Sequence, residues 1–281
     1  MDEEDNKLPI EPVPESEYGK KHKQEEEYFR KEEEEKIKRL HEKLTVQAAA
    51  GNKTKTLATL TNKDRLRLAE AVFALLIALA LTWLVVSVKS GPIAKYAELI
   101  LAWIWLYLPV LFIWTRKEGL KDFAIARLNL LRGLAWFLLA LIAIFPIFYL
   151  ASYFFAVKVL DCRFVLTIPK NFSGLAISQL LLISLPEEWF FRGYLQARFN
   201  QVLGKPWKFL SAQIGPGLFL TAILFSLAHF SLNPSPERLL VFFPGLVFGW
   251  LREKTDSILA PMLFHFACNL TFIIFQVSLL K

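Results

Sequence analysis

The chain has 281 residues and a net charge of +7, and its hydrophobic residues (54%) are largely segregated from a polar segment that ends near residue 65. Beyond it, long apolar runs alternate with short basic connectors, which excludes an ordinary soluble domain and is typical of transmembrane helices. The basic residues form no aromatic-interleaved patch, so nucleic acid is not an expected partner.

Residues 1–65 form a charged tail with 16 acidic and 14 basic residues. Its first 20 residues are acidic and contain three prolines, a composition that favours disorder. Residues 22–45 are rich in helix formers, with acid–base pairs at i,i+4 in the favourable order. These pairs are Glu26–Arg30, Glu27–Lys31, Glu32–Lys36 and Glu35–Arg39. We expect a partly disordered, partly helical cytoplasmic tail that acts either as a stalk or as a docking helix for a partner.

Seven apolar segments follow and predict an all-α, polytopic bundle of about seven transmembrane helices. They span residues 68–88, 96–114, 133–157, 173–198, 215–230, 239–252 and 257–279. The fifth and sixth are short for a bilayer of about 30 Å, so they are expected to be tilted, partly re-entrant or shielded by neighbours. We divide the chain into the tail at 1–65, N-terminal transmembrane helices at 66–160 and a C-terminal core at 161–281.

The connectors after the second, fourth and sixth apolar segments carry more lysine and arginine than the alternate connectors do. Basic connectors remain preferentially on the cytoplasmic side of a membrane. We therefore expect a multi-pass protein of the plasma membrane with a cytoplasmic N-terminus, in contact with membrane lipid.

Ionisable and amide groups inside a bilayer are energetically costly, so each one marks a candidate functional site. When glutamines and the span-end Arg198 are set aside, a few such side chains stand out between residues 134 and 281. They are Glu187, Glu188, Arg192, His229, His265 and Asn269. The remaining two histidines, His22 and His41, belong to the tail.

Glu188 and Arg192 stand at i,i+4, so they can pair on one helix face, either as a purely structural ion pair or within a site. Glu187 is rotated from Glu188 by about 100° on a helix and can face a different neighbour. A bidentate arginine can hold one carboxylate ionised and oriented, which leaves the other carboxylate for proton transfer.

Two further segments bring histidine into the membrane. His229 follows Phe225 by one helical turn, and His265 precedes Asn269 by one turn. Taken singly, His229 could reach the interface and Asn269 could join helices. Jointly, the segments supply a general base, a proton shuttle or metal ligand, and an amide donor for an oxyanion. Because unpaired polar groups are costly in lipid, we expect Glu187, His229 and His265 to converge.

The motifs E-E-x-x-x-R, F-x-x-x-H and H-x-x-x-N, in this order on successive membrane helices, resemble those of the CPBP (Abi) intramembrane proteases. That family includes the type II CAAX prenyl endopeptidases. The segment Phe191-Arg192-Gly193-Tyr194-Leu195 is similar to the family's F-R-G-x-L. The resemblance covers roughly residues 173–275 and leaves the tail without a counterpart.

The resemblance implies an intramembrane endopeptidase that hydrolyses a peptide bond of a membrane-associated substrate, such as a CAAX-type, leader or sorting-tail peptide. Glu187 and His229 would activate a water molecule. His265 and Asn269 would stabilise the oxyanion, and Glu188 and Arg192 would orient the site.

No cofactor is expected for such a reaction, because a water activated directly by Glu187 and His229 suffices. The alternative is a zinc ion held by Glu187, His229 and His265, since two histidines and a carboxylate form a catalytic zinc set. The sequence contains no H-E-x-x-H helix that would fix such a site locally.

Two other functions remain open. A protein of the same fold could bind a peptide without cleaving it, as an immunity or scaffold protein of the membrane. A small transporter could use the same side chains as a proton relay. The transporter interpretation predicts inverted repeats, and the sequence shows no such symmetry.

Overall fold

A computed structural model describes residues 59–123, 130–158 and 161–280, together with residues 27, 30–35, 37 and 38 of the tail. The chain divides into two compact units, Met1–Gly51 and Asn52–Lys281. In the first unit the described residues are helical, and Lys31 Nζ lies 2.8 Å from a Glu27 carboxylate oxygen, as the i,i+4 spacing predicts. The other three predicted pairs involve residues outside the described ones.

The second unit begins with two long antiparallel helices, α2 (Asn62–Ser87) and α4 (Ala97–Thr115), joined through the short α3 (Gly91–Lys95). A capping box starts α2: the Thr61 hydroxyl accepts from the Asp64 backbone N–H, while the Asp64 carboxylate accepts from the Thr61 N–H. Small residues at Ala71, Ala74 and Ala78 line the buried side of α2. Such residues let membrane helices pack closely.

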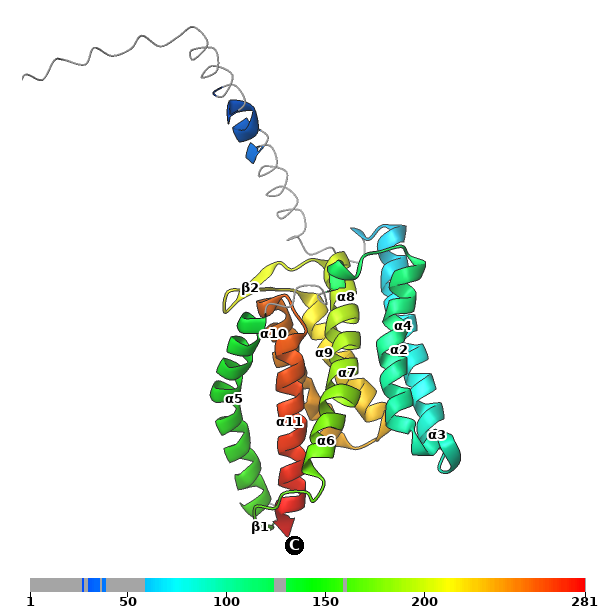
Figure 1. The fold of residues 1–281 in the computed structure, drawn as a ribbon, viewed down its shortest axis with the longest axis vertical. Helices are drawn as coiled ribbons and strands as arrows, with labels where there is room; N and C mark the ends of the chain where they lie inside the picture. The colour runs from blue at the N-terminus through cyan, green and yellow to red at the C-terminus, as the bar shows by residue number, and fades with distance from the viewer. Residues whose placement is uncertain are drawn as a thin grey trace, which may run out of the picture. The chain divides into compact units, whose positions relative to one another are not determined.

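After the short helical turn η2 (Leu120–Phe123), the third long helix, α5 (Leu130–Lys158), packs against the last one, α11 (Leu259–Ser278). A short antiparallel pairing of β1 (Arg163–Phe164) with β4 (Leu279–Leu280) joins the ends of these two helices. Figure 1 shows α5 and α11 side by side at one edge of this unit, with α2 and α4 at the other.

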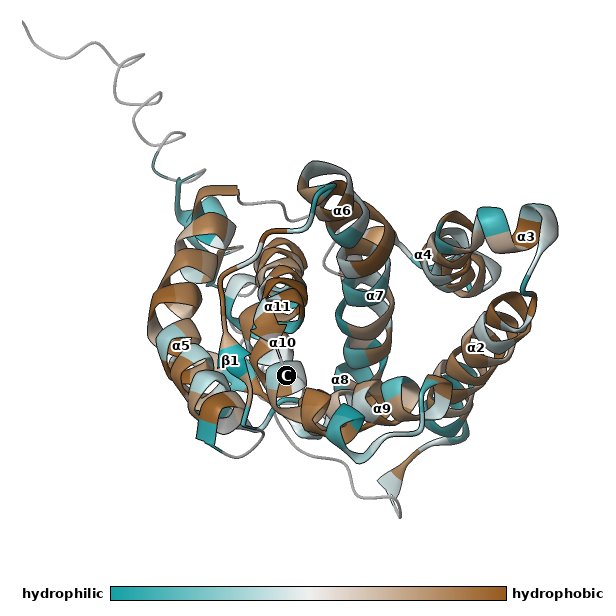
Figure 2. Ribbon diagram, turned by 90° about the horizontal axis from the view of Figure 1, so that it is seen from below, coloured by the Kyte–Doolittle hydropathy of each residue, from teal (hydrophilic) through white to brown (hydrophobic). Residues whose placement is uncertain are grey.

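Between these two pairs lies a continuous helical run from residue 172 to residue 203 (Figures 1 and 2). It consists of α6 (Phe172–Ser178), the π-helical η3 (Gln179–Ser184), α7 (Leu185–Glu188), the π-helical η4 (Trp189–Leu195) and α8 (Gln196–Leu203). Pro186 has no N–H to donate four residues back and crowds that carbonyl, which explains why the regular α-helical bonding is interrupted here. Such π-helical segments occur frequently at functional sites.

A tight hairpin of β2 (Trp207–Phe209) and β3 (Ala212–Ile214) turns the chain back into α9 (Pro216–Leu232). The 3₁₀ segment η5 (Pro236–Val241) then leads into α10 (Phe242–Thr255). Helix α9 packs on both α8 and α10, and α10 also packs on α11. Helix α11 in turn packs on the long run, so the run and these three helices form one packed group.

Two glycines set the close approach of α10 to the long run. Arg192 donates to the Gly245 carbonyl at 3.2 Å, and Gln196 donates to the Gly249 carbonyl at 3.0 Å. A Cβ on Gly249 would lie 2.8 Å from the Gln196 side-chain oxygen, so a larger residue would require the Gln196 side chain to move. The glycines stand at the G-x-x-x-G spacing used for membrane helix packing.

The predicted all-α membrane bundle is confirmed. Among the described residues, α2, α4, α5 and α11 are long and apolar enough to cross a membrane, and α9 is a shorter apolar helix. Large apolar side chains are exposed along α2, α4 and α5, where they can face lipid. Figure 2 shows hydrophobic residues along these helices and hydrophilic patches along α7 and α8. The chain is an integral membrane protein, and its core is centred on the fully buried Trp189, Phe190, Phe191 and Tyr194 of the long run.

Candidate active site

The adjacent glutamates lie on α7, between the two π-helical segments, and their carboxylates enter different surroundings. Glu188 is fully buried, whereas the Glu187 side chain keeps 22% of its surface exposed. The angular offset of successive helical residues accounts for this difference. The buried Glu188 carboxylate can therefore serve as a structural group, whereas the partly exposed Glu187 carboxylate can reach a reactant.

One carboxylate oxygen of Glu188 accepts hydrogen bonds from two side chains. Arg192 Nη1 donates to Glu188 Oε1 at 2.8 Å, and His265 Nδ1 lies 2.9 Å from the same oxygen. Because a carboxylate oxygen accepts, Nδ1 of His265 carries the proton. Burial of a charge is tolerated only when the charge is paired and hydrogen-bonded. Glu188 Oε1 meets that condition, whereas the buried Glu188 Oε2 and Arg192 Nε have no hydrogen-bond partner among the described residues.

Aromatic rings enclose the Arg192 guanidinium. Its central carbon lies 4.2 Å from the centre of the Phe225 ring and 4.9 Å from that of Phe248. The Phe248 ring also stacks on the His265 imidazole, with ring centres 4.8 Å apart. These contacts fix Arg192 and His265 in place and exclude water from around the ion pair.

Glu187 faces both membrane histidines. Its Oε2 lies 3.9 Å from Nε2 of His229 and 3.9 Å from Nε2 of His265. This oxygen is buried and accepts no hydrogen bond among the described residues. A separation of 3.9 Å is too long for a direct hydrogen bond, but one water molecule can bridge it.

The hydrogen bond made by Nδ1 of His229 determines the protonation of its other ring nitrogen, Nε2. His229 Nδ1 lies 2.9 Å from the Phe225 carbonyl oxygen, and its ring packs edge-on against the Phe225 ring. A carbonyl oxygen can only accept, so Nδ1 donates and the neutral imidazole presents a lone pair at Nε2. Glu187 Oε2 and His229 Nε2 are then two acceptors that face one another, an arrangement that a single water can satisfy by donating one proton to each.

Asn269 lies one turn beyond His265 on α11, and its amide bonds to a glutamine of the long helical run rather than to Glu187 or Glu188. Its Nδ2 donates to Gln179 Oε1 at 3.0 Å. The sequence analysis set the glutamines aside and so missed Gln179. Its position eight residues before Glu187, about two helical turns on the same run, was the signal that could have placed it on the face of the site.

The zinc alternative was tested against the spacing of the donor atoms. Two ligands of one tetrahedral zinc, at about 2.0–2.1 Å each, lie roughly 3.3 Å apart. Glu187 Oε2 lies 3.9 Å from each histidine nitrogen, and no group of three or more histidine, cysteine, aspartate or glutamate side chains in the described part of the chain is arranged to hold a metal ion. The side chains as placed do not fit the ion.

Residues 169–271 match the family model described as type II CAAX prenyl endopeptidase Rce1-like, which confirms the resemblance seen in the sequence. No curated protein and no solved structure gave a match. The matched segment contains all six candidate site residues and the whole of the long helical run from residue 172 to residue 203. This segment is similar to that family of CAAX-type intramembrane proteases over somewhat more than a third of the chain.

Proposed function

We propose that the chain is an intramembrane endopeptidase in which Glu187 and His229 activate the attacking water. The proposal proceeds from the Rce1-like match over residues 169–271 and from the geometry of three side chains. The observation that carries it concerns Glu187 Oε2, which accepts no hydrogen bond from the part of the chain that the structure describes and lies 3.9 Å from Nε2 of both His229 and His265.

In the proposed reaction, a water between Glu187 and His229 donates a hydrogen bond to each and directs its lone pair at the peptide carbonyl. As the oxygen–carbon bond forms, one water proton passes to Glu187 and the carbonyl becomes an oxyanion. Collapse of this intermediate breaks the carbon–nitrogen bond, and the proton is delivered to the departing amine. Atoms and charges therefore balance without a further reactant.

We assign oxyanion stabilisation to His265 and Asn269 on α11. Donation from His265 Nε2 requires the imidazolium form, because Nδ1–H is already held by Glu188. Imidazolium would bring the summed charge of Glu187, Glu188, Arg192 and His265 to zero. Asn269 retains a second amide hydrogen after donating one to Gln179, and that hydrogen is the proposed donor.

The proposed substrate is a membrane-associated protein or peptide, because the site residues are carried by helices of a membrane bundle. A CAAX-type tail is the first class to test, and leader or sorting-tail peptides are the next. We propose a plasma-membrane location, and the richer basic connectors support a cytoplasmic N-terminus.

The test compares newly formed peptide termini in host membranes that contain either the wild-type chain or Glu187→Ala at equal amounts. We expect one or a few cleaved proteins that appear only with the wild type. If the same proteins associate with both chains and no new termini form, the chain binds peptides without cleaving them and the proposal is wrong.

A further inference from the structure

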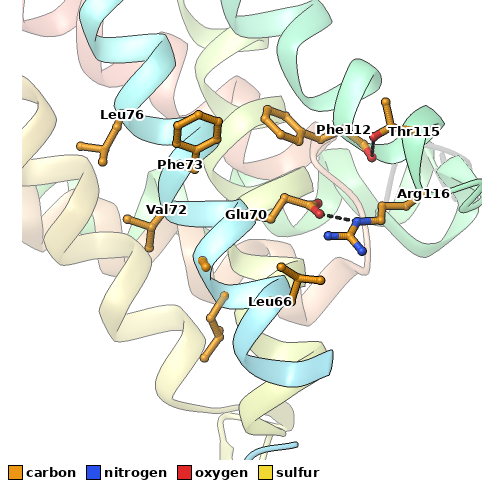
Figure 3. Close-up of a pocket in the computed structure, with 10 residues that line it drawn as sticks. Leu66, Glu70, Val72, Phe73, Leu76, Phe112, Thr115 and Arg116 are labelled. Atoms are coloured by element: carbon orange, nitrogen blue, oxygen red, sulfur yellow. Dashed lines mark hydrogen bonds and ion pairs between the residues drawn. The ribbon is translucent and has the colours of Figure 1, made fainter. Parts of the chain in front are cut away.

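An open apolar groove of about 820 Å³ lies between α2 and α4, and none of the six candidate site residues lines it. Its walls include Leu66 and Leu76 of α2 and the Phe73–Phe112 pair, whose rings meet edge to face at 6.5 Å (Figure 3). Leu66, Phe73 and Leu76 each expose more than half of their surface. Since both helices are membrane-spanning, this surface faces the bilayer, and a lipid acyl chain is the occupant that matches it in polarity.

One end of the groove is charged. Arg116, at the C-terminal end of α4, donates through Nε to Glu70 of α2 (Figure 3), and the same carboxylate also accepts from Arg198 and Tyr194 of the long helical run. In Figure 3 the two terminal nitrogens of Arg116 are joined to none of the residues drawn. The Arg116 side chain is 37% exposed, against 6% for Glu70.

The ion pairs around this end leave a surplus of positive charge. Glu118 pairs with Arg67 and Arg198, so the connected cluster contains three guanidinium groups and two carboxylates. Exposed basic side chains lie close by in the sequence, with Lys117 after Arg116 and Lys63 and Arg65 in the first turn of α2. The surplus positive charge is therefore assigned to Arg116, the most exposed arginine of the cluster. The basic residues near the ends of α2 and α4 add to it.

We propose that this groove binds an anionic phospholipid, with an acyl chain along the apolar walls and the phosphate on Arg116. The first turn of α2 and the last turn of α4 lie at the same end of this antiparallel pair, which is where a headgroup would lie. Basic sites at the ends of transmembrane helices attract anionic lipids, with about 1 kcal/mol for each lysine or arginine near the surface. This inference does not depend on peptidase activity.

The test uses the purified full-length chain in mild detergent, mixed with equal amounts of phosphatidylglycerol and phosphatidylcholine, and counts retained lipids by native mass spectrometry. We expect about a fivefold preference for phosphatidylglycerol, the factor that one basic side chain supplies. Arg116→Gln should abolish the preference. Glu70 retains Arg198 and Tyr194 as partners in that variant.

A second pair of variants tests the apolar part without touching the charges. Val72→Trp fills the groove and should lower the retention of both lipids severalfold. Val86→Trp is the matched control, because Val86 lies on the same helix, outside the groove, and is similarly exposed (44% against 40%). Equal retention of the two lipids by the wild type, or an undiminished phosphatidylglycerol count in both Val72→Trp and Arg116→Gln, would overturn the proposal.

Discussion

Glu187 and Glu188 are neighbours in the chain, yet their carboxylates have opposite environments. Glu188 is fully buried and held by Arg192 and His265, whereas the free oxygen of Glu187 faces Nε2 of both histidines. The i,i+4 spacing predicted the Glu188–Arg192 pair, and the structure places it at 2.8 Å. Helical spacing could not predict that His265 shares Glu188, because that contact joins residues 77 positions apart.

At the residue scale, the Gln179–Asn269 hydrogen bond gives a prediction about oxyanion stabilisation. Asn269→Ala should lower turnover by about 10²–10³-fold with little change in substrate binding, as for the loss of one oxyanion donor. Gln179→Ala should lower turnover less, because Gln179 only orients the Asn269 amide. The double variant should be no slower than Asn269→Ala. Additive losses in kcat across this double-mutant cycle would show that Gln179 acts independently of Asn269.

The spacing of Glu187, His229 and His265 predicts that the reaction does not require a metal. Extended treatment of the purified protein with a strong zinc chelator should therefore leave kcat unchanged. The measurement is turnover of one peptide before and after treatment, with the metal content of the same sample determined by mass spectrometry. Loss of turnover that returns on adding zinc would contradict this prediction and favour the zinc alternative.

At the scale of elements, Glu187 and His229 lie at the same depth in the bundle, although counting residues within the predicted segments suggests different depths. Such counting places Glu187 in the middle of the fourth segment and His229 near the end of the fifth. In the structure α9 approaches α8 closely near Gly217 and Asn200. From there, 13 residues lead to Glu187 and 12 lead to His229, or about 20 and 18 Å of helix. The two side chains therefore reach the same depth.

Gly217 makes this approach possible. A Cβ at this position would lie 2.4 Å from Asn200 Oδ1 and 3.0 Å from the Asn200 backbone nitrogen. Gly217→Val should push α9 away from α8 and shift His229, which we expect to lower turnover by about 10²-fold, since small misplacements of catalytic groups have effects of this size. Leu220→Phe, at a 39% exposed position of the same helix, is the control and should remain active. Unchanged turnover in Gly217→Val would show that the close packing of α9 on α8 is not what positions His229.

The bundle's element types were predictable, and its irregularities were not. Long uncharged runs define transmembrane helices by length and polarity alone, and this signal identified α2, α4, α5 and α11. The π-helical segments on either side of α7 depend on how the backbone around Pro186 accommodates its neighbours. Hydropathy carries no information about this local backbone geometry, so it predicts only one uninterrupted helix over 173–198.

At the scale of the whole molecule, the tail and the membrane bundle are separate units, Met1–Gly51 and Asn52–Lys281. All six candidate site residues lie in the second unit, and the family match begins at residue 169. We therefore predict that deleting residues 1–45 leaves the turnover of a purified substrate within about twofold of the full chain's. Loss of turnover while the bundle keeps its melting temperature would show that the tail takes part in the reaction.

The most direct test of the account is the comparison of Glu187→Ala, His229→Ala and Glu188→Ala on one cleavable substrate, with each melting temperature measured in the same detergent. We predict that the first two variants fold normally and show no turnover, because they remove the groups that activate water. Glu188→Ala should lose both activity and stability, because an unpaired buried Arg192 costs about 3–5 kcal/mol. Near wild-type turnover of Glu187→Ala, together with a folded but inactive Glu188→Ala, would contradict the account and exchange the roles of the two glutamates.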